Sequence, residues 1–548
     1  MRKLLLSTLS LALLLAGNSQ LKADELKPVV VVSLPSYDSL SADLNFIAQV
    51  ADMPELPKQF EQGSAQLNGG QGIKGLDKTK PIGLALVFDA GGQPKFVGFV
   101  GSTDLKALLG SLPLPAADKG DGSFEITSPQ GPVRVEQKGG WAVFSNEPDL
   151  IKSLPVDPSQ LLGGLDKDYG AALRVNVQNI PPQMRDMFMN LVKMGAEASL
   201  QQRPGEDEND FALRKGSTQA ILKQLDQVAH DLDQLTLGLA VDTEAKAVHL
   251  DATVTFVADS KLAKAAGEKS SGKSDFAGFL QPNAAFNLNF SQKLGADDIA
   301  QLTDMLKAGR TKVMAQLEKD PNLSDETTQK AAKQLVDQLF DIGESTIKGG
   351  KIDGGAALIL DPSALTFAAG GFVSDGSEVE KMFKKLVELG QADPNFPPVK
   401  FDVETYKGVR FHNVAIPMND AQGKQLFGDT LDVYLAVGDH STYVAFGKGS
   451  VALLKSVIDK SSADASETLP PFQMNVALTP IVKFVDTIQP GNPATSAIAQ
   501  ILAATGGKDH LKINAKMIEN GATYRIEAEE GVLKVLGLAA KIGKGQHP

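Results

Sequence analysis

The sequence contains no cysteine and few aromatic residues, with one Trp and six Tyr among 548 residues. Without cysteine, a disulfide framework, a thiolate metal site and a cysteine nucleophile are all excluded. Glycine and proline are near ordinary usage, with 52 and 29 residues, which excludes a collagenous or wholly disordered chain. The scarcity of aromatic side chains also argues against a sugar-stacking platform. The composition thus describes a globular chain and identifies no reaction.

The N-terminal residues have the order typical of an export signal. Arg2 and Lys3 precede an apolar run of 13 residues, LLLSTLSLALLLA, and a polar stretch comes after it. This run is too short for a spanning helix, which needs about 20 residues. We therefore expect residues 1–23 to be a signal peptide cleaved after Ala23, with a buried N-terminal helix as the alternative. Because no cysteine is present to carry a lipid anchor, the expected location is the periplasm or the extracellular space.

The charge of the chain disfavours nucleic acid as a partner. The sequence has 54 Lys and Arg residues against 66 Asp and Glu residues, a formal charge of −12. Loss of Arg2, Lys3 and Lys22 with the signal peptide would leave 51 against 66, or −15. An acidic surface repels phosphate backbones, so we expect no nucleic-acid binding. No later segment contains 18 consecutive apolar residues, so no transmembrane segment is expected after signal cleavage.

Four segments of the chain repeat one pattern: an alternating strand, a turn, a second strand and a short helix rich in Lys and Leu. They begin at Ile82, Leu235, Gly355 and Leu511. The turns contain the residues that tight turns require, such as Asn520-Gly521. Each hairpin is preceded by a helical stretch, and before that by a lone strand that begins at Pro28, Ala171, Ala285 or Phe472.

The helical stretches of the second and third repeats have one apolar face, which we expect to be buried on a sheet or on a partner helix. In the second repeat this face consists of Ile221, Leu222, Leu225, Val228, Ala229, Leu232 and Leu235.

A second type of repeat occurs twice, which suggests a tandem duplication. The segment FEITSPQGPVRV from Phe124 parallels FDVETYKGVRF from Phe401, and WAVFSNEPDLIKSLP from Trp141 parallels YVAFGKGSVALLKSVI from Tyr443. The two kinds of repeat therefore come in the same order in each half of the chain. Each half would be a module of about 240 residues.

These repeats predict an α+β fold in two similar lobes, each a mainly antiparallel sheet covered by helices. The first lobe is expected at 24–265 and the second at 284–543. The segment 266–283 between them is rich in Gly, Ser and Lys, which is typical of a linker. The alternative is one continuous sheet shared by both lobes.

Three glycine motifs match nucleotide-binding patterns but have the wrong surroundings. Residues 267–274 read GEKSSGKS, a P-loop pattern, but no strand runs directly into it and Pro282 lies close behind it. The GxGxxG at residues 70–75 is preceded by polar residues instead of a strand. Gly447, Gly449 and Ala452 come after a strand, yet that strand belongs to a predicted antiparallel hairpin, and Ser450 is explained as a helix N-cap. We therefore predict no nucleotide cofactor.

Metal-binding and acid–base motifs are also missing. None of the six histidines, His230, His249, His412, His440, His510 and His547, has the spacing of a helical zinc motif. No GxSxG elbow is present. His412 and His440 lie in the same repeat and could meet in space, but a solvated or structural role is favoured for both. The acidic group of Asp118, Asp121 and Glu125 lacks the ligand spacing of a calcium loop.

One helix has an unusually soft apolar face, formed by Met184, Met187, Phe188, Met189, Leu191 and Met194. Core packing is the expected role of this face. The alternative is an adaptable surface for a lipid tail or a partner helix, because thioether side chains repack easily.

The signal peptide and the repeated hairpin–helix units, such as DLIKSLP from Asp149 and ALLKSVI from Ala452, resemble loosely those of large exported bacterial proteins of unknown function. This resemblance implies an envelope location and assigns no activity.

We therefore expect a non-enzymatic envelope protein, a binding or scaffold protein that presents sheet surfaces or an inter-lobe groove to a protein partner or an apolar ligand. The alternatives are an extracytoplasmic hydrolase with a site assembled from distant acidic residues and His, and a structural component of a surface assembly. The sequence predicts no catalytic residue, no cofactor-binding residue and no metal ligand.

Overall fold

A computed structural model describes residues 26–543 except 67–71, 90, 114, 130, 198–199, 269–271, 321–324, 392 and 464–468. The predicted signal peptide lies outside the described residues. The chain divides into two compact units. Unit 1 comprises the described residues of Met1–Gly195, Leu225–Ser260 and Arg525–Pro548, and unit 2 those of Ala196–Gln224 and Lys261–Tyr524.

These units interleave along the chain, whereas the sequence predicts two consecutive lobes, 24–265 and 284–543. Two contacts explain why the C-terminal residues belong to unit 1. Arg525 forms a bidentate ion pair with Asp251, with both N–O distances at 2.8 Å. Gly537 lies so close to the backbone of Ala51 that an added Cβ would clash with its carbonyl oxygen.

The sheet of unit 1 is antiparallel throughout its described pairings. The strand order is β4-β5-β6-β7-β3-β2-β1-β8-β9-β10. The strands are β1 (Val30–Leu34), β2 (Ile82–Phe88), β3 (Pro94–Gly101), β4 (Ala116–Asp118), β5 (Ser123–Ser128), β6 (Gly131–Lys138), β7 (Trp141–Ser145), β8 (Ala171–Asn176), β9 (Leu232–Asp242) and β10 (Ala247–Phe256).

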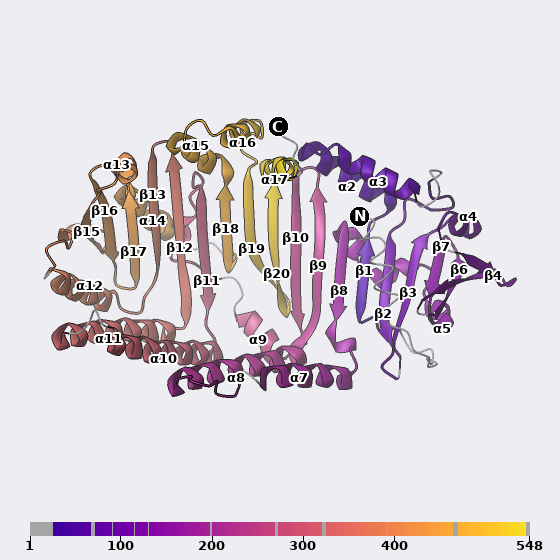
Figure 1. Cartoon of the computed structure of the whole chain (residues 1–548), viewed down its shortest axis with the longest axis horizontal. Helices are drawn as coiled ribbons and strands as arrows, with labels where there is room; N and C mark the ends of the chain where they lie inside the picture. Colours follow the sequence, from indigo (N-terminus) through magenta and orange to yellow (C-terminus); the bar gives the residue numbers. More distant parts are fainter. Residues whose placement is uncertain are drawn as a thin grey trace. The chain divides into compact units, whose positions relative to one another are not determined.

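One face of this sheet packs on short helices to form the core of unit 1. Phe99 and Trp141 meet there edge to face, with ring centroids 5.4 Å apart, and Leu162 and Leu165 complete the packing. The helical elements assigned wholly or partly to this unit are α2 (Tyr37–Val50), α3 (Glu55–Gln66), α4 (Leu105–Gly110), α5 (Pro148–Ser153), η1 (Pro158–Leu162), α6 (Leu165–Asp168), η2 (Val177–Asn179), α7 (Pro182–Glu197), α8 (Glu208–Asp231) and α17 (Glu530–Gly543). In the view of Figure 1, α2 and α3 lie beyond one end of the strands of unit 1 and α7 lies beyond the other.

The sheet of unit 2 is antiparallel as well, in the order β14-β15-β16-β17-β13-β12-β11-β18-β19, and β20 pairs with β19. Its strands are β11 (Phe286–Lys293), β12 (Lys351–Asp361), β13 (Ala364–Phe372), β14 (Val399–Tyr406), β15 (Val409–Pro417), β16 (Thr430–Val437), β17 (Ser441–Gly447), β18 (Phe472–Ala477), β19 (His510–Ile518) and β20 (Gly521–Glu529), which the unit boundary divides. Its helical elements are α9 (Lys261–Glu268), η4 (Ala277–Phe279), α10 (Ala296–Lys319), α11 (Glu326–Lys348), α12 (Gly376–Gly390), α13 (Ala421–Phe427), α14 (Ser450–Ala463), α15 (Leu478–Ile488) and α16 (Pro493–Ala503).

The strand order of unit 2 matches that of unit 1 strand for strand, from β4/β14 to β9/β19. Each predicted lone strand (β1, β8, β11 and β18) and each predicted hairpin (β2–β3, β9–β10, β12–β13 and β19–β20) is present. The pairing order corrects one detail of the predicted repeat. The sequence aligns β5–β6 with β14–β15, but β6 pairs with β7, whereas β15 is separated from β17 by β16. By position in the sheet, β5–β6 therefore corresponds to β15–β16.

The predicted linker, residues 266–283, is not a linker over its described part, Gly272–Asn283. Phe276 and Phe279 are almost fully buried and lie within 6.5 Å of the Tyr443 ring, measured between centroids. The Ser274 hydroxyl donates a hydrogen bond of 2.6 Å to the buried carboxylate of Asp353. Composition was misleading here because two phenylalanines in a Gly- and Ser-rich segment are enough to dock it.

Helices account for 44% and strands for 32% of the structure, which confirms the α+β class. Among the described residues, no helix is both long and apolar enough to cross a membrane.

Candidate functional site

The second face of the unit 1 sheet carries rows of aliphatic side chains that are partly exposed. One row crosses five strands through Leu84, Val32, Leu173, Leu237 and Ala252, each directly paired with the next. Directly paired residues of neighbouring antiparallel strands lie on the same face of a sheet, so these side chains are neighbours. The row forms a continuous aliphatic surface.

Two further rows extend this surface. Leu86, Val30, Val175, Leu235 and Val254 form a parallel row on the same strands. Leu239 and Leu250 form a directly paired couple nearer the hairpin turn. We call these twelve residues the aliphatic face: Val30, Val32, Leu84, Leu86, Leu173, Val175, Leu235, Leu237, Leu239, Leu250, Ala252 and Val254.

Exposure distinguishes the aliphatic face from the core face of the same strands. Leu173, Leu237, Leu239 and Leu250 are 36–45% exposed, and the remaining members are half-buried. Ala172, the neighbour of Leu173 in sequence, points to the opposite face and is 6% exposed. The opposite face of β1 and β2 is largely apolar and buried, whereas that of β8–β10 also carries Arg174, Thr236 and Asp251.

The strands that carry the aliphatic face have their backbones satisfied. β1, β2, β8 and β9 each pair on both sides, and β10 pairs with β9 and β20. An additional strand therefore cannot join the sheet at these positions. The aliphatic face offers side chains alone, a chemistry suited to an apolar ligand.

Helix α7 carries a second exposed apolar surface. Met187, Phe188, Leu191 and Met194 are 56–64% exposed, while Met189 is buried. Met187, Leu191 and Met194 also line a shallow hollow of about 430 Å³. The expectation of core packing is therefore correct for Met189 and wrong for the four exposed residues, which we call the methionine face.

The predicted burial of the apolar face of α8 is also corrected by the structure. Ile221, Leu225 and Val228 are 37–56% exposed, although the sequence predicts that their face is buried. Leu225 and Val228 belong to unit 1 and Ile221 to unit 2.

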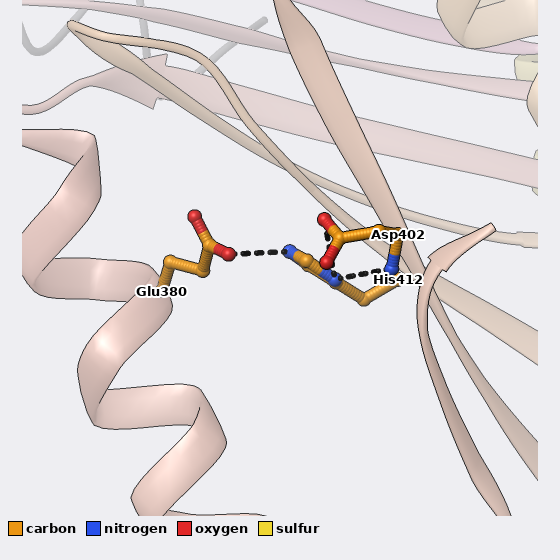
Figure 2. A group of neighbouring side chains, drawn as sticks. All are labelled: Glu380, Asp402 and His412. Atoms are coloured by element: carbon orange, nitrogen blue, oxygen red, sulfur yellow. Dashed lines mark hydrogen bonds and ion pairs between the residues drawn. The ribbon is translucent and has the colours of Figure 1, made fainter. Parts of the chain in front are cut away.

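His412 is the buried centre of a polar cluster in unit 2, drawn in Figure 2. Its ring is fully buried between Phe383 and Phe401, with ring centroids 5.8 and 5.7 Å away. Nδ1 accepts a hydrogen bond of 3.1 Å from the backbone N–H of Asp402. The ring is therefore the neutral tautomer that carries its proton on Nε2.

The other ring nitrogen of His412 faces a carboxylate without bonding to it. Nε2 has no hydrogen-bond partner among the described residues and lies 3.8 Å from Glu380 Oε1. Glu380 is already engaged by Lys384, at 2.6 Å, and by the guanidinium of Arg410. Burial alone would raise the pKa of Glu380. Together the two cations have the larger, opposite effect, so the pKa of Glu380 lies below its ordinary value.

Burial lowers the pKa of His412 below its ordinary value. The Glu380 and Asp402 carboxylates raise it, while Lys384 and Arg410 lower it, so their effects oppose one another. The ring is therefore neutral at pH 7.

This cluster is poorly arranged to hold a metal ion, although Glu380, Asp402 and His412 place potential ligand atoms within 4.8 Å of one another. Glu380 lies 3.8 Å from Nε2 and Asp402 3.9 Å from Nδ1 (Figure 2), and neither contact is as short as a hydrogen bond. An ion bound to the ring would have to displace the Nε2 proton or the Nδ1 hydrogen bond, and it would compete with Lys384 and Arg410 for Glu380. The cluster is also unsuited to hydrolysis, because the ring of His412 is fully buried and leaves no room for a substrate.

His440, His230 and Asp121 are engaged in local structure, and His547 lies outside the described residues. His440 is exposed and its Nδ1 lies 2.8 Å from the carbonyl of Ser374. His230 is exposed and contacts the carbonyl of Asp226 within its own helix. The Asp121 carboxylate accepts hydrogen bonds from Ser123 and Arg134, which hold its pKa well below the usual range.

The glycine motifs do not form nucleotide sites in the described residues. In the P-loop match, Ser274 bonds to Asp353, and residues 269–271 lie outside the described residues. Of the GxGxxG at 70–75, residues 70 and 71 also lie outside them. Gly447 ends a strand of an antiparallel sheet, as expected.

The aliphatic face was not predicted from the sequence, although a signal was present. Strands such as VVVSL, IGLALVF and LTLGLAVD have few polar residues at alternate positions. An antiparallel sheet with one solvated face shows a clear apolar–polar alternation, so continuous apolar strands indicate two apolar faces.

Comparisons with known proteins found no matching family model, no matching curated protein and no matching solved structure.

Proposed function

We propose that this protein is an exported, non-enzymatic binding protein whose aliphatic face holds the acyl chain of a lipid. The observation that carries the proposal is the pair of five-residue aliphatic rows on interior strands of unit 1. Export to the periplasm or beyond is proposed from the order of residues 1–23, which lie outside the described residues.

The composition of the aliphatic face favours an acyl chain over a protein partner. Protein interfaces concentrate their binding energy in Trp, Tyr and Arg, and Leu is under-represented at their energetic centres. The aliphatic face contains only Leu, Val and Ala, and the one Trp of the chain, Trp141, is buried in the core. A flexible hydrocarbon chain needs no aromatic anchor, because each buried CH₂ contributes about 0.8 kcal/mol.

The chemistry of the remaining chain supports a binding role. His412 is buried without access, His230 and His440 are engaged locally, and the chain has no cysteine. The hydrolase alternative needs a reactive group in an accessible cleft, and His412 does not meet that requirement.

A titration with a fluorescent fatty acid tests this proposal on the full chain. The double variant Leu237→Gln/Leu250→Gln places polar groups at two of the four most exposed positions of the aliphatic face. We expect it to weaken binding roughly thirtyfold relative to the natural chain, because about 2 kcal/mol of apolar contact is removed. The matched control is Leu339→Gln on α11, where the leucine is 53% exposed but far from these strands in sequence.

Equal affinity of the double variant and the control would contradict the proposal, as would the absence of fatty-acid binding by the natural chain. High-order oligomers in light scattering, without lipid binding, would support the alternative of a surface assembly.

A further inference from the structure

The bulge in strand β14 brings a backbone amide to His412. The register between β14 and β15 shifts between Lys400 and Glu404, and Asp402 within this shift has a φ of +51°. A β-bulge with a residue in the left-handed region leaves the normal ladder and turns its amide to a new acceptor. Here that acceptor is Nδ1 of His412.

β14 is an edge strand of the unit 2 sheet, because β15 is its one partner among the described strands. A bulge in such an edge strand protects the edge against pairing with other chains. Whatever holds the bulge therefore controls whether this edge stays closed.

We propose that His412 is an acid-sensitive latch, which holds the β14 bulge while its imidazole is neutral and releases it when the imidazole is protonated. A proton from solvent can bind only at Nδ1, because Nε2 already carries one. Nδ1 then becomes a donor and faces the N–H of Asp402, which is also a donor. The hydrogen bond that fixes the bulge is thereby lost.

The charged groups around His412 determine how the bulge responds to protonation. Glu380 and Lys384 face the ring from α12, Asp402 from β14 and Arg410 from β15. The Asp402 carboxylate, with Oδ1 3.9 Å from Nδ1, is the group placed to accept the new Nδ1–H. Because that carboxylate belongs to the bulge itself, the new hydrogen bond pulls on the side chain of Asp402 while the backbone N–H of the same residue loses its acceptor.

Release of the bulge would also loosen its apolar neighbour. Phe401 precedes Asp402 and packs against both His412 and Phe383. Phe401 is already 37% exposed, so a turn at Asp402 would bring more of this ring into solvent. Protonation of His412 at low pH would thus open the edge strand β14 and expose the aromatic side chain of Phe401.

Hydrogen exchange of the full chain, measured by mass spectrometry on peptides covering 399–406, tests the latch. We expect the protection factor of this segment to fall about tenfold per pH unit once the pH lies below the folded-state pKa of His412. In His412→Asn the side-chain oxygen can still accept from Asp402 but cannot titrate, so protection should not depend on pH. In His412→Phe protection should be low at every pH. The control is His440→Asn, which should behave as the natural chain.

Nitrogen-15 spectra of histidine-labelled protein provide a second measurement that needs no folded variant at position 412. We expect His412 in the Nε2–H tautomer at pH 7.5, with a protonation midpoint that coincides with the midpoint of exchange at 399–406. Parallel loss of protection in the natural chain and His412→Asn would overturn the proposal. So would constant protection while the ring protonates, or a ring that stays neutral until unit 2 unfolds.

Discussion

At the scale of single residues, two buried carboxylates of this protein pair with arginines that are remote in sequence. Asp251 and Arg525 are 274 positions apart, yet they form the bidentate pair that joins β20 to β10. Glu380 and Arg410 form a second such ion pair, between residues that are 30 positions apart. Local patterns cannot identify such pairs, because each residue alone has the sequence context of an ordinary surface charge.

The Asp251–Arg525 pair predicts an asymmetric response to mutation. The side chain of Asp251 is 4% exposed and that of Arg525 is 39% exposed. Arg525→Met would leave a buried carboxylate without its cation, so we expect it to cost about 3 kcal/mol. Asp251→Asn would leave a guanidinium that water can reach, and should cost less.

Urea unfolding monitored by the fluorescence of Trp141 measures this difference, because the only tryptophan lies in unit 1. Equal destabilisation by the two variants would contradict the assigned burial.

The buried imidazole of His412 predicts a pH dependence of stability. Its folded-state pKa lies below the unfolded value of 6.5, so the unfolded chain binds more protons in the range between them. The contribution of the neutral ring is complete above pH 6.5 and is lost as the pH falls through the folded-state pKa.

Calorimetry of the natural chain and His412→Asn between pH 7.5 and 5 checks the sign. The natural chain should lose more stability on acidification than the variant. A steeper loss in the variant would show that the folded-state pKa is raised.

At the scale of elements, strands and hairpins were predictable and the role of several helices was not. Alternation and turn residues such as Asn520, whose φ is +54° between β19 and β20, specify a hairpin from neighbouring residues alone. The burial of a helix depends on what packs against it, and periodicity contains no information on that partner. The exposed residues of α7 and α8 show this limit.

The docked segment at residues 272–283 predicts a large loss of stability for Phe279→Ala. Phe279 is fully buried against Tyr443 and α14, so its removal leaves a cavity that should cost about 3–5 kcal/mol. Denaturation monitored by circular dichroism measures the loss, with Leu339→Ala on the exposed surface of α11 as the control. A flexible linker would tolerate both changes equally.

The methionine face predicts a defined order of oxidation. Met187 and Met194 are 56% and 64% exposed, whereas Met189 is 5% exposed. Under mild peroxide, peptide mapping should find sulfoxide at Met187 and Met194 well before Met189. Oxidation of Met189 at an equal rate would mean that α7 is turned differently.

At the scale of the whole molecule, the order of strands was partly predictable. The repeated hairpins indicated a duplicated α+β protein, and the two units do have the same strand order. We propose the duplication on that basis. The aliphatic face was not predicted because it arises from five strands that are brought together by three pairings between segments remote in sequence, β1 with β2, β1 with β8 and β8 with β9. The sequence alone shows the apolar character of each strand and not the neighbour that aligns it.

The net negative charge is also a property of the whole molecule, and it bears on the choice of partner. We expect the formal charge of −12 to disfavour phosphate backbones as partners.

Photo-crosslinking with a diazirine-bearing fatty acid is the decisive test of the proposed lipid binding, because it reports where an acyl chain lies. We expect the label in peptides from 171–176 and 232–256, and we expect excess unlabelled fatty acid to abolish it. Labelling that is confined to α7, spread evenly over the chain, or insensitive to competition would contradict binding at the aliphatic face.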